Sequence, residues 1–137
     1  MSTPASTPYQ DAIDSSNRGL ILFAHGSRDP LWRDPLEAIA ARIATQAPNT
    51  HIACAYLELC EPTLAATAAV MVEKGAQRIR VLPMFFGVGK HAREDLPVLM
   101  DELTALYPHV QFTCEQAVGQ HPALLQAIVN IAINEHN

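Results

Sequence analysis

The sequence predicts a single α/β domain built on a parallel sheet, and three observations support that prediction. Short apolar runs alternate with segments whose apolar residues recur at helical spacing. Prolines and glycines stand at the boundaries between these segments. The chain has 137 residues, 49% of them hydrophobic and 17% charged, which is typical of one packed globular domain. Strict alternation of strands and helices indicates parallel strands joined by right-handed crossovers.

The first half of the chain predicts two strand–helix pairs. Leu20–Ala24 is a short apolar run that predicts the first strand, and Asp34–Gln46 places apolar residues at helical spacing before Pro48. Ile52–Leu57 predicts the second strand in the same way. Pro62 then lies in the first turn of a helix that runs to about residue 74 and ends at a glycine.

The second half predicts two more pairs. Arg78–Met84 predicts the third strand, and a helix follows it from residue 93 or 95 to Leu106, before Tyr107-Pro108. Val110–Cys114 predicts a weaker fourth strand, and Pro122–Ile133 predicts the last helix. We therefore expect a flavodoxin-like domain over residues 19–137, with four parallel strands in the order 2-1-3-4 and helices on both faces.

Composition excludes several classes of protein. Residues 1–18 are polar and rich in Ser, Thr and Pro, which predicts a disordered leader and not a secretory signal. No apolar run approaches the roughly 20 residues that span a bilayer, so we expect a cytoplasmic protein without a membrane partner. The net charge of −5 argues against a nucleic-acid partner. Cys54, Cys60 and Cys114 lack CxxC spacing, and we expect Cys54 and Cys114 to be small core residues.

Three of the predicted strands lead to a side chain that can bind a metal ion. His25 follows the first strand, Glu58 the second, and His91 follows the third after Gly87-Val88-Gly89-Lys90. The carboxyl ends of parallel strands share one edge of the sheet, which is where ligands bind in open α/β sheets. Two imidazoles and a carboxylate suit a borderline divalent transition metal. Each residue alone could serve a turn or a helix end, whereas their shared position favours a site. His121, directly before Pro122, is interpreted mainly as a helix-entry residue.

Three other kinds of active site are disfavoured, each by a particular residue in these loops. Gly87-Val88-Gly89-Lys90 lacks phosphate-loop spacing, and His91 stands where that loop has a hydroxyl residue. No GxSxG motif surrounds Ser27, which disfavours a serine hydrolase. A phosphohistidine phosphatase would need an arginine where Ala24 stands.

Five segments resemble the small, single-domain sirohydrochlorin cobaltochelatases, a family of class II chelatases, in both order and spacing. They are FAHGSRD at 23–29, YLEL at 56–59 with EPTL at 61–64, VLPMFF at 81–86, GKHAREDLP at 89–97 and VGQHP at 118–122. The resemblance covers about residues 19–133 and implies a chelatase-like fold. It implies insertion of Co²⁺, or in relatives Fe²⁺ or Ni²⁺, into a sirohydrochlorin-type tetrapyrrole without ATP or a permanently bound cofactor. The pathway served would be cobalamin or sirohaem biosynthesis.

The resemblance also assigns roles to residues. His25 and His91 match the metal-binding and catalytic histidines of the family, and Glu58 matches its acidic partner. The substrate bears many carboxylates, so Arg28, Lys90 and Arg93 are candidate side chains to bind them. Longer chelatases carry two such domains with the site between them, which implies a homodimer for a chain with one copy.

Two further hypotheses stay open beside the chelatase. A noncatalytic metal or tetrapyrrole carrier would need the same His25, Glu58 and His91 around an ion. A flavodoxin-like interaction domain would bind no metal tightly at this edge. The type of metal does not follow from a two-histidine, one-carboxylate set, since Co²⁺, Fe²⁺ and Ni²⁺ differ too little in ligand preference.

Overall fold

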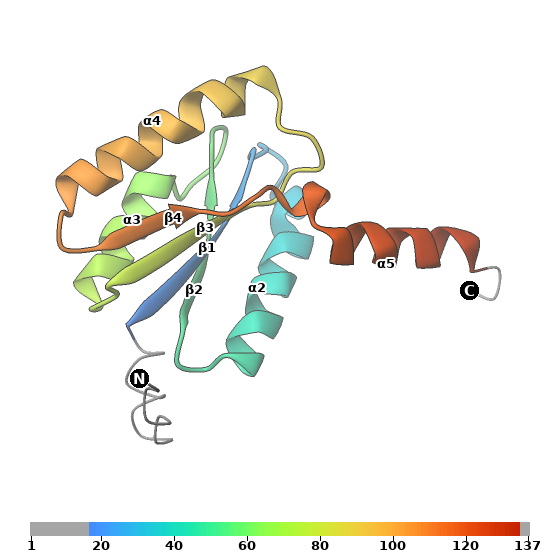
Figure 1. Cartoon of the computed structure of the whole chain (residues 1–137), viewed down its shortest axis with the longest axis horizontal. Coiled ribbons are helices and arrows are strands. Elements are labelled where there is room, and N and C mark those ends of the chain that lie inside the picture. The colour runs from blue at the N-terminus through green and yellow to red at the C-terminus, as the bar shows by residue number, and fades with distance from the viewer. Residues whose placement is uncertain (1–16, 135–137) are drawn as a thin grey trace, which may run out of the picture.

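The computed structural model describes residues 17–134 as one parallel sheet with helices around it (Figure 1). The strands are β1 (Arg18–Ala24), β2 (His51–Tyr56), β3 (Arg78–Pro83) and β4 (Gln111–Cys114). Their order is β2-β1-β3-β4 and all three pairings are parallel, which confirms the predicted fold. The α-helices are α2 (Asp34–Gln46), α3 (Leu64–Glu73), α4 (Lys90–Leu106) and α5 (Pro122–Ile133). Two short 3-10 helices are η1 (Pro30–Arg33) and η2 (Val118–Gln120).

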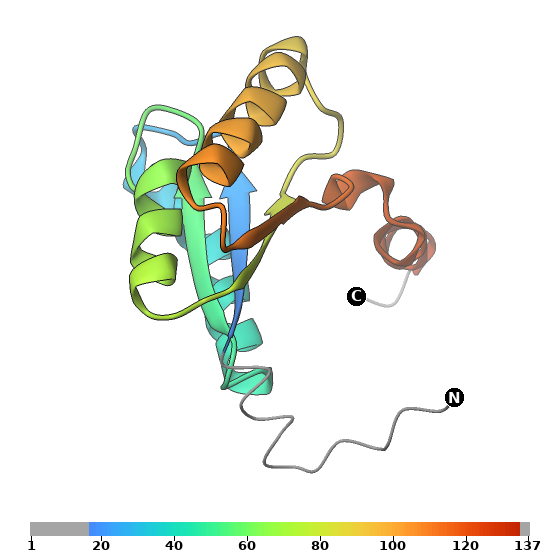
Figure 2. The ribbon, with the colours of Figure 1, turned by 60° about the vertical axis from the view of Figure 1, so that its left-hand side comes forward.

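The two faces of the sheet are covered by different helices (Figure 2). α3 and α4 lie on one face, and their apolar residues share a core with Ile21 and Phe23 of β1. α2 lies on the other face, where Leu22 and Tyr56 pack against Leu36. Successive residues of a strand point to opposite faces, so one apolar run supplies both cores.

Short polar side chains begin two of the helical segments. The Thr63 hydroxyl accepts a hydrogen bond from the backbone N–H of Ala66 at 3.1 Å, at the start of α3. The Asp29 carboxylate accepts one from Leu31 at 2.9 Å, at the start of η1. Each bond satisfies a backbone donor that has no partner inside the helix. These caps determine where the loops after β1 and β2 end.

Two predicted boundaries were wrong. Arg18, assigned to the leader, is the first residue of β1 and pairs with Arg78 of β3; the rest of the leader, residues 1–16, lies outside the described residues. α4 begins at Lys90 and continues through Pro97, several residues before the predicted start. Pro97 has no backbone N–H, so the helical hydrogen bond to the carbonyl of Arg93 is missing. Both residues are exposed to water.

Two further differences concern exposure. Cys54 is partly buried, but Cys114, the last residue of the edge strand β4, is exposed, so its prediction as a core residue was wrong. α5 has no buried residue and extends away from the sheet (Figures 1 and 2). None of the helices between residues 17 and 134 is long and apolar enough to cross a membrane.

Candidate functional site

The carboxyl ends of β1, β2 and β3 meet at one edge of the sheet, as the sequence predicted. Backbone hydrogen bonds continue past the strands, with Leu57 donating to Ala24 at 2.9 Å and Met84 donating to Phe23 at 2.7 Å. One residue further, the N–H of Glu58 donates to the carbonyl of His25 at 3.0 Å. The backbones of His25 and Glu58 are therefore direct neighbours at this edge.

Gly26 is the residue that lets these two segments approach. Its φ of +101° lies in the left-handed region, which residues with a Cβ rarely adopt. A Cβ at this position would overlap the carbonyl oxygen of Glu58. The glycine after His25 therefore serves both the turn and the contact between the loops that follow β1 and β2.

The imidazole of His25 is exposed and lies against Phe85, the second residue after β3. Its ring centroid is 4.9 Å from that of Phe85, with an angle of 52° between the planes. Phe85 is buried and makes an edge contact of 6.2 Å with Phe23 in the core. A rigid aromatic side chain thus supports one side of the imidazole, and the other ring surface remains available to a ligand.

His91 lies in the first turn of α4 and not in the preceding loop, because the helix starts earlier than expected. Its Nε2 atom is 3.1 Å from Oδ2 of Asp95, one turn further along the helix. Asp95 was not among the predicted site residues. The four-residue spacing between His91 and Asp95 was the available signal, since residues at i and i+4 share one face of a helix.

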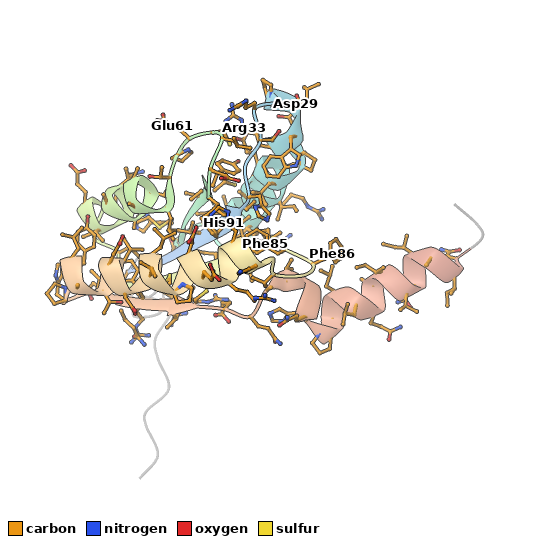
Figure 3. All side chains as sticks on the ribbon, turned by 90° about the horizontal axis from the view of Figure 1, so that it is seen from above. Asp29, Arg33, Glu61, Phe85, Phe86 and His91 are labelled. Carbon is orange, nitrogen blue, oxygen red and sulfur yellow. The ribbon has the colours of Figure 1, made fainter. Side chains whose placement is uncertain are left out.

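Figure 3 looks onto this edge and shows the loops that surround it. His91 and Phe85 lie near the centre, and Asp29, Arg33 and Glu61 come from the loops that follow β1 and β2. A guanidinium N–H of Arg33 donates to the carbonyl of Glu61 at 3.4 Å, which joins the two loops.

Within residues 17–134, no group of three or more His, Cys, Asp or Glu side chains is placed so that it could hold a metal ion. The structure brings the backbones of His25 and Glu58 together, while His91 pairs with Asp95. Metal binding by His25, Glu58 and His91 stays a prediction from the sequence.

The predicted carboxylate-binding side chains occupy different places. Arg28 is exposed in the loop after β1, and Lys90 is the exposed first residue of α4. Arg93 contributes to a hollow of about 310 Å³ between α4 and the end of β4, together with Met100 and Cys114. Arg28 and Lys90 thus lie on loops and helix ends at the carboxyl edge, whereas Arg93 borders a separate hollow.

Exposed apolar side chains on the same loops were not recognised in the sequence. Leu31 is 73% exposed and Trp32 41% in η1, Leu59 is 52% exposed after β2, and Phe86 is 71% exposed after β3. A second hollow, of about 310 Å³, lies beside them between Leu57 and the Asp95 side of α4. The signal was available, since large apolar residues in short loops after strands have no local reason to be apolar. Their clustering at one edge suits a flat apolar ligand or another protein surface.

Beneath these loops, on the α2 face, two side chains titrate at unusually high pH. Burial raises the pKa of the Cys54 thiol to about 11, with a further rise from the charge of Glu37. Burial likewise raises the pKa of Tyr56 to about 12. Both groups stay protonated in the folded protein near neutral pH, so they belong to the packing beneath the site.

A family model described as CbiX matches residues 19–134. Among curated proteins, the sirohydrochlorin cobaltochelatase of Methanopyrus kandleri is 32% identical over 59% of this chain and 57% of its own. The sirohydrochlorin cobaltochelatase of Priestia megaterium is 28% identical over 81% of this chain and 36% of its own. The chloroplastic sirohydrochlorin ferrochelatase of Arabidopsis thaliana is 26% identical over 80% of this chain and 49% of its own. The chain thus spans between 36% and 57% of the length of these three curated relatives.

Solved structures share the fold. A CbiX protein of Marinobacter aquaeolei VT8 superposes with a TM-score of 0.73 at 31% identity, covering 84% of this chain and 93% of that one. The sirohydrochlorin chelatase SirB of Bacillus subtilis subspecies spizizenii, in complex with cobalt, has a TM-score of 0.70 at 23% identity. This second match covers 83% of this chain and 49% of the other. At 23% identity it shows a shared fold and nothing more.

Proposed function

Because the chain belongs to the CbiX family, we propose that it is a sirohydrochlorin chelatase. It inserts a divalent metal ion into a sirohydrochlorin-type tetrapyrrole without ATP, and the metal is a substrate and not a resident cofactor. The observation that supports this most directly is the position of His25 at the carboxyl edge, exposed, held against Phe85 and bonded through its carbonyl to Glu58. Glu58 and His91 follow the next two strands at the same edge.

The chemistry of metal insertion suits these side chains. The reaction must remove water from a divalent ion, hold the ion near the plane of the macrocycle and take up two protons from pyrrole nitrogens. Neutral imidazoles of His25 and His91 can bind the ion and accept protons after they release it. The Glu58 carboxylate can balance the charge of the ion or take the second proton.

Asp95 extends this arrangement. Its carboxylate lies 3.1 Å from Nε2 of His91, so it orients the ring and favours the tautomer with a hydrogen on that nitrogen. In that tautomer the Nδ1 atom of His91 carries the lone pair that would meet the ion.

The loops around the edge suit the rest of the substrate. Leu59, Phe86 and the η1 residues present apolar surface on which a macrocycle could lie. Arg28 and Lys90 can pair with peripheral carboxylates. Arg93 is a weaker candidate, because it borders the hollow between α4 and β4.

We further propose that the active form is a homodimer. The edge carries no group of three metal-binding side chains within the part of one chain that the structure describes. The chain covers 49% of the Bacillus chelatase and 36% of the Priestia cobaltochelatase, so a second copy would supply a unit that longer relatives carry in one chain. Two facing edges would also enclose a flat macrocycle better than one.

Cobalt is the proposed metal, and cobalamin biosynthesis the proposed pathway. Most of the curated relatives named here are cobaltochelatases, while the Arabidopsis relative is a ferrochelatase and points to sirohaem as the competing pathway. A cytoplasmic location stays a prediction from the sequence.

An absorbance assay tests the function. Purified protein is mixed with sirohydrochlorin and Co²⁺, Fe²⁺ or Ni²⁺ in parallel, and the metallated product is followed against a protein-free reaction. We expect product in molar excess over protein, formed fastest with Co²⁺. Product that stops at one equivalent would indicate a carrier, and rates equal to the protein-free reaction would contradict both. Faster turnover with Fe²⁺ would assign the enzyme to sirohaem.

A further inference from the structure

The only tryptophan of the chain lies in the short helix that follows β1, at the carboxyl edge. Trp32 belongs to η1 and is 41% exposed within the part of the chain that the structure describes. Burial of an indole removes more apolar surface from water than burial of almost any other side chain, so this exposure leaves a large stabilisation unused. An exposed tryptophan beside a candidate site is therefore a candidate contact for a ligand.

A buried ring of the neighbouring strand supports the indole from one side. The ring centroid of Trp32 is 6.0 Å from that of Tyr56, the last residue of β2, with an angle of 59° between the planes. Tyr56 is fully buried in the core on the α2 face. Tilted aromatic pairs of this kind add to the stabilisation from buried area, so the indole is held against the core and keeps its other side open.

The backbone that carries Trp32 is held by hydrogen bonds within its own loop and to the next one (Figure 3). The backbone N–H of Trp32 donates to the carbonyl of Asp29 at 3.1 Å, and the N–H of Asp29 donates to the Ser27 hydroxyl at 3.0 Å. The next residue, Arg33, donates to the carbonyl of Glu61 in the loop after β2. A side chain that is already fixed in place loses little conformational freedom when a ligand binds to it.

Trp32 and His25 are two exposed rings of the same loop, each supported by a buried ring from a different neighbour of β1. His25 lies on Phe85, which follows β3, and Trp32 lies on Tyr56, which ends β2. Since β2 and β3 flank β1, the backbones that carry the two supports are about 10 Å apart, or two strand spacings. A tetrapyrrole ring is of comparable width, so a macrocycle that lies across the end of the sheet at His25 extends toward Trp32.

We propose that the indole of Trp32 contacts the tetrapyrrole and contributes to substrate binding without taking part in metal insertion. The inference rests on the proposed chelatase function and deepens it, because it separates a residue that binds the macrocycle from the residues that handle the ion. Aromatic rings prefer offset or edge contacts with one another, and the open side of the indole can make either with a conjugated macrocycle.

The role of Trp32 predicts a particular change in the kinetics. An indole neither holds a divalent ion nor accepts a proton from a pyrrole nitrogen, so its contact is equally strong before and during metal insertion. Loss of such a contact raises KM and leaves kcat unchanged. We expect Trp32→Leu to raise KM for sirohydrochlorin about tenfold, with kcat within about twofold of the wild type. Trp32→Phe, which retains an aromatic ring, should recover most of this loss.

Tyr107→Leu is the matched control. It breaks a comparable aromatic pair, since the centroids of Tyr107 and Phe112 are 6.1 Å apart, but this pair lies at the amino edge of the sheet, between α4 and β4. The control should keep the wild-type KM. An unchanged KM for Trp32→Leu, or an equal rise in both variants, would overturn the inference and leave the chelatase function intact. A wild-type protein that forms no metallated product would instead contradict the chelatase function itself.

A second test measures the contact without metal or turnover. Because the chain has one tryptophan, its fluorescence reports on Trp32 alone. Acrylamide should quench the exposed indole readily in the free protein, and saturation with metal-free sirohydrochlorin should shield the remaining emission from acrylamide. Equal access of acrylamide with and without bound tetrapyrrole would overturn the inference. Shielding that is present without tetrapyrrole and is lost on dilution to the monomer would also overturn it, since a second copy of the chain would then cover Trp32.

Discussion

The imidazole of His25 lies against the ring of Phe85, with 4.9 Å between the centroids, although sixty positions separate the two residues in the chain. Phe85 is buried, whereas His25 is exposed. The contact therefore holds a solvent-exposed side chain against a rigid part of the core. In a chelatase, this would keep the imidazole in one orientation while a metal ion arrives and leaves.

Replacing Phe85 should lower both the stability of the fold and the rate of metal insertion, and the two effects can be measured separately. Phe85→Leu removes the aromatic contact with both His25 and Phe23 but leaves an apolar side chain. We expect a loss of about 1–2 kcal/mol in the free energy of unfolding and a fall of roughly 3–10-fold in metal insertion. Urea unfolding and the absorbance assay measure the two effects. Phe86→Leu, at an exposed position, should change stability by less than about 0.5 kcal/mol.

Gly26→Ala should be strongly destabilising. The new Cβ would require a left-handed backbone at φ +101° and would overlap the carbonyl of Glu58. We expect a loss of about 2 kcal/mol or more, measured by urea unfolding. Gly89→Ala is the matched control, since a Cβ there has no atom within 4 Å and the backbone is not left-handed. Similar losses for both variants would show that the contact with Glu58 is unimportant.

The two histidines at the carboxyl edge should be needed for activity but not for folding. His25→Ala and His91→Ala each remove an exposed imidazole, so stability should change little. Metal insertion should fall by about 10²-fold or more, the usual range for a lost acid–base group. His109→Ala, which removes an exposed imidazole from the loop before β4, should retain normal rates. Normal turnover by either edge variant would contradict the proposed site.

Alkaline pH should destabilise the fold through Cys54. Its pKa is raised from 9.0 to about 11 in the folded protein, mainly by burial, so the unfolded chain loses this proton first as pH rises. The stabilisation is complete below about pH 9 and is lost between pH 9 and 11. At about 1.4 kcal/mol per pKa unit the rise corresponds to roughly 3 kcal/mol, which solvent screening reduces because the thiol is only partly buried. Cys54→Ala should flatten this part of the stability curve, as thermal or urea unfolding at several pH values can measure. An unchanged slope in that variant would contradict the assignment.

Local patterns were sufficient for most of the secondary structure. Asp34–Gln46 and Pro122–Ile133 match the observed helices residue for residue, because periodicity and flanking prolines are local signals. The start of α4 was predicted at residue 93 or 95 and not at Lys90, because the residue before the helix is Gly89, which makes no side-chain capping hydrogen bond and so gives no start signal.

For the candidate site too, some features could be predicted from the sequence and others could not. Placing His25 and Glu58 at one edge required only the order of parallel strands, which chain direction determines. The hydrogen bond from Glu58 to His25 and the support from Phe85 depend on loop geometry, whereas the pairing of His91 with Asp95 depends on where α4 begins. Loops of this kind have no periodic signal in the sequence.

By itself, the sequence determined that the protein is a parallel α/β domain and which side chains its strands deliver to the carboxyl edge. Apolar runs, helical periods and chain direction are sufficient for this, because each acts over a few residues or follows from topology. Only the tertiary structure decided that Gly26 must approach the carbonyl of Glu58, that Phe85 supports His25 and that α5 extends away from the sheet. These features depend on contacts between residues far apart in the chain. The pattern of α5 shows that it is apolar, and only the packed fold shows that none of its residues is buried by the described part of the chain, residues 17–134.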